Sequence, residues 1–68
     1  MAKYRMFIPD IHCDHCKMRI TKALHEIGEK NFEVNVEKKL LIIETKDATR
    51  VMQKLAEIDY PVSNFEEA

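Results

Sequence analysis

Changes in the spacing of apolar residues divide this chain into six segments, and the order of these segments restricts the fold more than any other feature. Residues 3–8 alternate in polarity, which predicts a half-buried strand that ends at Pro9. A helical pattern follows, with Asp14 as the expected N-cap and Gly28 at the position of a left-handed C-cap. The apolar stripe of this helix consists of Ile20, Ala23, Leu24 and Ile27.

The second half of the chain repeats the strand and helix patterns in a different order. Residues 32–36 and 40–44 are predicted strands, and residues 37–39 between them form a hairpin turn. Asp47 can cap a second helix, which ends at residues 59–61, before a short strand at residues 62–65. The order β-α-β-β-α-β predicts an α+β fold, the ferredoxin-like βαββαβ sandwich. In this fold two helices cover one face of a four-stranded antiparallel sheet.

Both cysteines of the chain, Cys13 and Cys16, lie where the first strand gives way to the first helix. A Cys-x-x-Cys pair at such a junction fits either a clamp for a soft metal ion or a redox couple. Cys16 is expected in the first helical turn, where unpaired N–H groups favour the thiolate. Thiolates select soft ions such as Cu(I) and also bind Zn(II). A site with only two sulfurs leaves coordination positions open, which suits an ion that is passed on.

Two other side chains near the cysteines, those of Asp10 and His12, are candidate donors. Asp10 and His12 would supply harder oxygen and nitrogen ligands, which favour tetrahedral Zn(II) or Cd(II) over two-coordinate Cu(I). The simpler interpretation is that both are solvated loop residues. His15 is expected to point into water, and His25 falls on the opposite face of the helix, which excludes it as a ligand.

Composition and charge exclude several classes of protein. The formal net charge is −1, so no overall field attracts nucleic acid or an acidic membrane. No apolar run approaches the roughly 20 residues that span a bilayer, and the chain enters a strand pattern at once. We therefore expect no signal peptide and a cytoplasmic protein. Lys17, Arg19 and Lys22 form either a solvated face or a basic rim that steers an acidic partner.

Two alternative functions share features with this pattern. A dithiol oxidoreductase has the same cysteine spacing, but a thioredoxin-like fold needs a further strand and helix after Pro61, where only seven residues remain. An RNA-recognition module has the same element order, but it stacks bases on aromatic residues of its central strands, and residues 40–43 supply none. We therefore expect a non-enzymatic protein that binds no nucleic acid and does not insert into membranes.

The run from Cys13 to Ile20, with Gly28 closing the helix and residues 59–62 before the last strand, resembles the heavy-metal-associated domain. Within that family it is most similar to the small bacterial copper chaperones. The resemblance covers essentially the whole chain, so residues 1–68 are expected to form a single such domain. The chain departs from the family pattern at residues 10–12, where Asp-Ile-His replaces the usual Gly-Met-x. Ile11 can take the packing role of that methionine.

The resemblance implies a role for specific residues. Cys13 and Cys16 would hold Cu(I) nearly linearly and pass it to a partner through shared-thiolate intermediates. The implied partners are the amino-terminal domain of a metal-transporting P-type ATPase or a metal-responsive repressor, and the chain itself would be a monomer or a metal-bridged dimer. Tyr60 matches a position that shields the metal, although it also suits a core aromatic. Asp10 and His12 leave Zn(II) or another soft divalent cation as the alternative to Cu(I).

Overall fold

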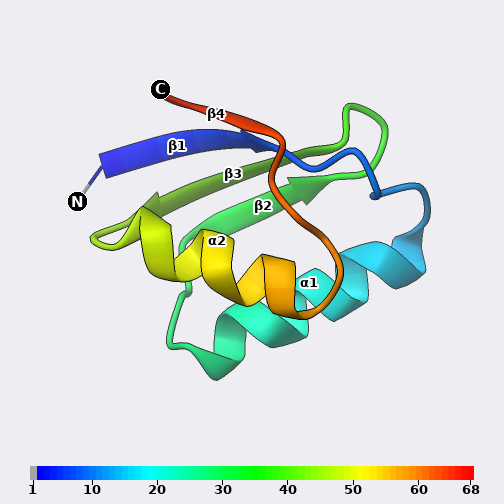
Figure 1. The fold of residues 1–68 in the computed structure, drawn as a ribbon, viewed down its shortest axis with the longest axis horizontal. Coiled ribbons are helices and arrows are strands. Elements are labelled where there is room, and N and C mark those ends of the chain that lie inside the picture. Colours follow the sequence, from blue (N-terminus) through cyan, green and yellow to red (C-terminus); the bar gives the residue numbers. More distant parts are fainter. Residues whose placement is uncertain (1) are drawn as a thin grey trace.

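The structure, a computed structural model, describes residues 2–68 of the chain. The described part folds into a four-stranded sheet and two helices (Figure 1). In chain order the elements are β1 (Ala2–Phe7), α1 (Asp14–Glu26), β2 (Phe32–Asn35), β3 (Leu40–Thr45), α2 (Ala48–Glu57) and β4 (Asn64–Glu67).

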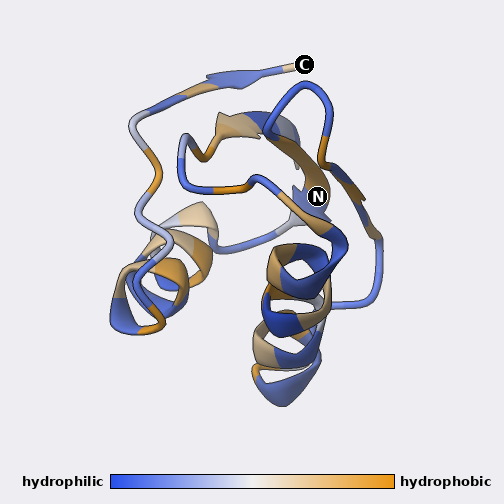
Figure 2. Ribbon diagram, turned by 90° about the vertical axis from the view of Figure 1, so that its right-hand side faces the viewer, coloured by the Kyte–Doolittle hydropathy of each residue, from blue (hydrophilic) through white to orange (hydrophobic). Residues whose placement is uncertain are grey.

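The sheet is antiparallel throughout, with the strand order β2-β3-β1-β4. The central strand β1 pairs with β3 in a register that places Tyr4 opposite Ile43, and with β4 in a register that places Met6 opposite Phe65. Both helices lie on the same side of the sheet, as Figures 1 and 2 show from two directions. This arrangement confirms the predicted ferredoxin-like βαββαβ fold.

The core lies between the sheet and the two helices. Alternation along β1 buries Met6 and exposes Arg5, while Leu41 and Ile43 of β3 are fully buried. The inward register of β3, which four consecutive apolar residues left open in the sequence, is thus that of Leu41 and Ile43. Cys16 is part of this core cluster, so one of the two thiols is anchored in the body of the domain.

Capping residues set the ends of both helices. Asp47 caps α2 as predicted, since its carboxylate accepts a hydrogen bond from the Arg50 N–H at 3.0 Å. Gly28 follows α1 with φ +84°, the left-handed conformation expected of a C-terminal glycine. Between Ala2 and Ala68, neither helix combines the length and the apolar character that crossing a membrane requires.

Several boundaries differ from the sequence prediction by one or two residues, and two of these differences have a clear physical reason. The N-cap of α1 is Cys13 rather than Asp14, because the Cys13 carbonyl already accepts bonds from the N–H groups of Cys16 and Lys17. The last strand begins at Asn64 rather than at residue 62. Asn64 pairs with Phe7, the final residue of β1, so the residues before Asn64 run past the end of the partner strand.

Candidate metal site

The loop that carries the site is fixed at both of its faces. Ile8 and Ile11 are fully buried beneath it. On the other side, the Ile8 N–H donates to the Lys39 carbonyl at 2.9 Å, and the Lys39 ammonium donates to the Pro9 carbonyl at 3.3 Å. Ile11 thus takes the buried position beneath the loop that we expected of it, and the β2–β3 hairpin braces the loop from outside.

The two thiols lie side by side in unequal environments. The Cys13 and Cys16 sulfurs are 3.7 Å apart, and both cysteines are free. Cys13 is exposed, whereas Cys16 retains only 3% of its accessible surface. The pair therefore presents one sulfur to an incoming partner and keeps the other at a defined position in the protein.

Neighbouring groups favour the thiolate form of Cys16. Its pKa is lowered to about 7, first because the Tyr60 hydroxyl donates a hydrogen bond to the sulfur, and next because the His12 backbone N–H does so. Burial opposes this shift, and hydrogen bonds from Cys13 add to it. This shift favours the thiolate, which is the form of a cysteine that binds metal ions.

Tyr60 reaches this position from the turn after α2. Its N–H donates to the Leu55 carbonyl at 2.8 Å, its side chain is buried, and the Arg19 guanidinium lies 5.5 Å from the centre of its ring. The hydrogen bond to Cys16 also raises the pKa of Tyr60, since the bond holds the phenolic proton. Tyr60 is therefore a core aromatic that also lies beside a thiol, and the shielding of a metal by Tyr60 stays a prediction.

This contact gives a prediction for the acidity of Cys16. In Tyr60→Phe the largest contribution to the shift is lost, so the Cys16 pKa should rise from about 7 toward the usual thiol range. Ultraviolet absorbance of the thiolate, followed against pH, measures this shift. Arg19→Gln is the control, because it removes the cation over the ring and keeps the hydroxyl; a pKa that stays near 7 in Tyr60→Phe would contradict the account.

His12 joins the two cysteines in a three-donor cluster. One ring nitrogen of His12 and the sulfurs of Cys13 and Cys16 all lie within 4.8 Å of one another. The His12 Nδ1–H donates to the Asp10 main-chain carbonyl at 2.7 Å, and Nδ1 lies 3.9 Å from the Cys16 sulfur. Asp10 thus contributes its carbonyl to the loop, while its carboxylate is outside the cluster found among the described residues.

The other candidate residues lie away from the cluster. His15 is exposed, and His25 packs against the Phe32 ring with 5.5 Å between the ring centres, as expected of a surface histidine. Met18 is 68% exposed on the outward face of α1.

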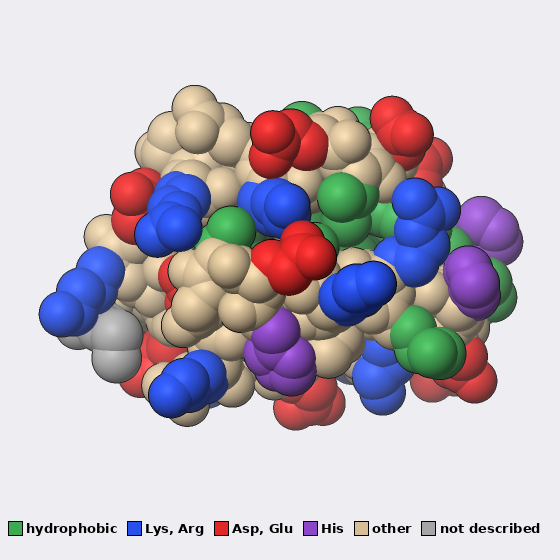
Figure 3. Space-filling model, turned by 90° about the horizontal axis from the view of Figure 1, so that it is seen from below, with side chains coloured by type: hydrophobic (Ala, Val, Ile, Leu, Met, Phe, Trp, Pro, Cys, Tyr) green, Lys and Arg blue, Asp and Glu red, His purple; other side chains and the backbone are tan. Residues whose placement is uncertain are grey.

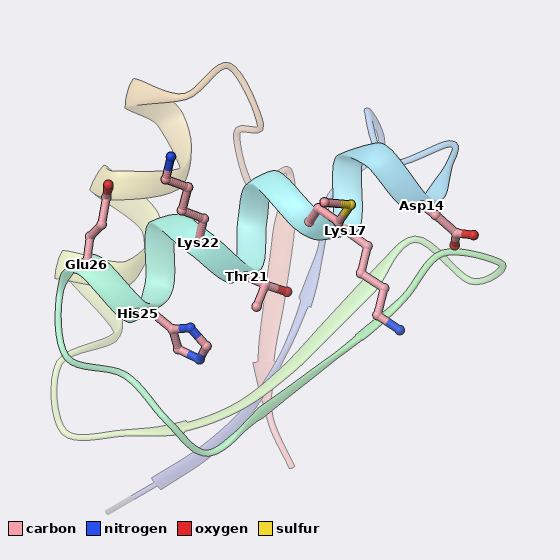
Figure 4. A pocket seen from close by; sticks show the side chains of 7 residues that line it. Asp14, Lys17, Thr21, Lys22, His25 and Glu26 are labelled. Atoms are coloured by element: carbon pink, nitrogen blue, oxygen red, sulfur yellow. The ribbon is translucent and has the colours of Figure 1, made fainter.

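The three basic residues after the cysteines divide between two places. Lys17 and Lys22 line an open surface groove along α1 together with Met18, and two acidic residues, Asp14 and Glu26, line the same groove (Figure 4). Arg19 turns instead to the Tyr60 ring. Acidic and basic side chains are interspersed over the helical side of the molecule in Figure 3, and the groove likewise has two residues of each sign, so neither surface is uniformly basic.

The structure also bears on the redox alternative. After Pro61 the described chain forms only β4, which adds an edge to the existing sheet. The strand and helix that a thioredoxin-like fold requires after this proline are not found within residues 62–68.

The fold and the site together define a small α+β domain that presents a pair of free thiols for a soft cation. A sequence profile of the heavy-metal-associated domain matches residues 5–60, and the chain belongs to this family. The family and the adjacent cysteines together support heavy-metal binding.

A solved relative agrees with this assignment along nearly the whole chain. The NMR structure of a heavy metal binding protein from Thermotoga maritima is 53% identical in sequence and superposes with a TM-score of 0.93. The match covers 97% of this chain and 98% of the Thermotoga protein. Among curated proteins, no significant match was found.

Proposed function

We propose that this domain is a non-enzymatic metal carrier that binds one soft cation, Cu(I) in the first instance, through Cys13 and Cys16 and hands it to a partner. The observation that carries the proposal is the unequal pair of sulfurs, 3.7 Å apart at the start of α1. The exposed Cys13 can exchange a bond, while the buried Cys16 keeps the ion in place during the exchange.

Transfer then follows from ligand exchange at the open side of the ion. A thiolate of the partner adds to the ion as the bond to Cys13 breaks, and a second partner thiolate then replaces Cys16. No electron changes hands, because Cu(I) and every sulfur keep their oxidation states. The lowered pKa of Cys16 supports this step, because a less basic thiolate is the better leaving group.

The groove beside the site suggests how a partner would dock. Lys17 and Lys22 flank the exposed Met18 within the first two turns after Cys16. A partner surface with acidic residues opposite the two lysines and an apolar residue opposite Met18 would complement this part of the groove, whereas Asp14 and Glu26 would require basic or neutral neighbours. We propose as partner the amino-terminal domain of a metal-transporting P-type ATPase or a metal-responsive repressor. Because both cysteines must stay reduced, the cytoplasm is the compartment in which such a carrier can work.

The test of this function is transfer of Cu(I) to an isolated metal-binding domain of such an ATPase. Reversal of both groove charges, Lys17→Glu with Lys22→Glu, should slow transfer about tenfold or more at low salt and leave Cu(I) affinity unchanged, because rim charges act on association. Stopped-flow mixing measures the rate, and chelator competition measures the affinity.

A matched variant separates the groove from the overall charge. Lys30→Glu with Lys46→Glu changes the net charge equally at two exposed positions outside the groove. This variant should transfer at nearly the wild-type rate. Equal slowing by both variants would remove the groove from the account, and failure of the wild-type protein to transfer Cu(I) at all would refute the carrier function.

A further inference from the structure

The spacing of the three donors matches a cation that takes more than two ligands. With metal–sulfur bonds of about 2.3 Å, sulfurs 3.7 Å apart enclose an angle of about 107° at the ion, close to the tetrahedral value. A linear arrangement with bonds of that length needs sulfurs about 4.6 Å apart. The exposed Cys13 would then have to move outward, whereas a tetrahedral ion fits the sulfurs where they lie.

The His12 side chain lies where it can supply a third donor to an ion held between the two sulfurs. A ring nitrogen lies within 4.8 Å of both sulfurs, so a short movement of an exposed side chain brings it into bonding distance of a shared ion. Sulfur and imidazole donors together are the usual tetrahedral set for Zn(II). Two-coordinate Cu(I) has no need of the third donor.

The main chain fixes the tautomer of the His12 ring in the metal-free protein. A carbonyl oxygen only accepts hydrogen bonds, so the 2.7 Å contact with Asp10 places the proton on Nδ1, the nitrogen 3.9 Å from the Cys16 sulfur, and the lone pair of Nε2 binds an ion only after the ring turns. Metal-binding histidines usually make such a bond from the nitrogen that does not ligate. Asp10 therefore contributes through its backbone, as the hydrogen-bond partner of Nδ1.

We propose that His12 is the third donor of this site for a divalent cation of the Zn(II) type, and that it adds nothing to Cu(I) binding. The site then has two modes, two sulfurs for Cu(I) and two sulfurs with one nitrogen for Zn(II). In the second mode the fourth position stays open to water or to a donor of the partner, so the ion remains transferable. This inference rests on the proposed use of Cys13 and Cys16 as the metal-binding pair.

Two titrations and one spectrum test the proposal. Zn(II) and Cu(I) affinities of the wild-type protein and of His12→Ala are measured by competition with chromophoric chelators. Replacing the imidazole should weaken Zn(II) binding by at least about tenfold, the lower end of what the loss of even an outer-shell partner of a ligand costs. Cu(I) affinity should stay within about threefold, less than 1 kcal/mol. In the zinc-edge X-ray absorption spectrum, the imidazole scattering of the wild-type protein should vanish in His12→Ala.

His15→Ala is the matched control, because His15 is an exposed histidine three residues away and outside the donor cluster. It should bind both ions like the wild-type protein. The proposal is overturned if His12→Ala retains wild-type Zn(II) affinity, if it loses Cu(I) equally, or if His15→Ala shows the same defect. If His12→Ala keeps both wild-type Zn(II) affinity and Cu(I) binding, this proposal fails and the carrier function stands. If the wild-type protein fails to bind Cu(I), the carrier function is refuted instead.

Discussion

Replacing either cysteine with serine should lower Cu(I) affinity by more than about a thousandfold, equivalent to roughly 4 kcal/mol, while the domain stays folded. A hydroxyl is a hard and weakly acidic donor, so it cannot replace a thiolate toward a soft ion. Cys13→Ser should leave the free energy of unfolding unchanged because the side chain is exposed. Cys16→Ser should cost about 1–3 kcal/mol, since it places a hydroxyl in a buried position.

Competition with a strong Cu(I) chelator measures the affinities, and far-ultraviolet circular dichroism checks the fold. Met18→Leu is the control, because Met18 is an exposed sulfur residue of the same helix that lies outside the donor cluster. It should keep the wild-type affinity. If Cys13→Ser with Cys16→Ser still held Cu(I) against the chelator, the assignment of the site would be wrong.

Ile11→Ala should lower the free energy of unfolding by about 2–5 kcal/mol, as expected for a large aliphatic residue truncated in a core. Ile11 is fully buried directly before the donor residues, and its backbone N–H closes a turn to the Ile8 carbonyl at 3.2 Å. In a domain of 68 residues a loss of this size removes much of the total stability. The midpoint of urea unfolding measures the effect in the metal-free protein.

Ile11→Met separates volume from chemistry at this position. Methionine is the residue that the family usually carries here, and it is close to isoleucine in volume, so the cost should stay below about 1.5 kcal/mol. Bound Cu(I) should recover part of the stability of Ile11→Ala, since the ion binds the folded state. A loss below about 1 kcal/mol in Ile11→Ala would show that the loop does not depend on this side chain.

The sequence pattern predicted the architecture well, because most helices and strands had a characteristic spacing of apolar residues and a residue that ends the element. The helix from Asp14 had a clear apolar stripe and a glycine at its end, and both features reappear as the buried residues of α1 and the positive φ of Gly28. The last strand was misplaced by two residues at its start. Its beginning is set by where β1 stops, which is a tertiary constraint that no local pattern of residues 62–67 contains.

The site was less accessible from sequence than the fold. The spacing of Cys13 and Cys16 indicated either a soft-metal clamp or a redox couple without a structure, and it placed Cys16 in the first helical turn. The hydrogen bond from Tyr60 joins residues more than forty positions apart, so only the packing of the turn after α2 reveals it. Likewise, the sequence did not distinguish between Asp10 and His12 as donors. In the structure the loop brings the His12 imidazole close to the two sulfurs, and the Asp10 carbonyl accepts a hydrogen bond from it.

The copper-edge X-ray absorption spectrum of the Cu(I)-loaded protein is the most direct test of the central claim. The account predicts two sulfur neighbours per ion in the wild-type protein, and the loss of sulfur scattering when both cysteines are replaced. A first shell without sulfur, or an ion enclosed by four protein donors in a single chain, would contradict a carrier that holds its cargo between Cys13 and Cys16.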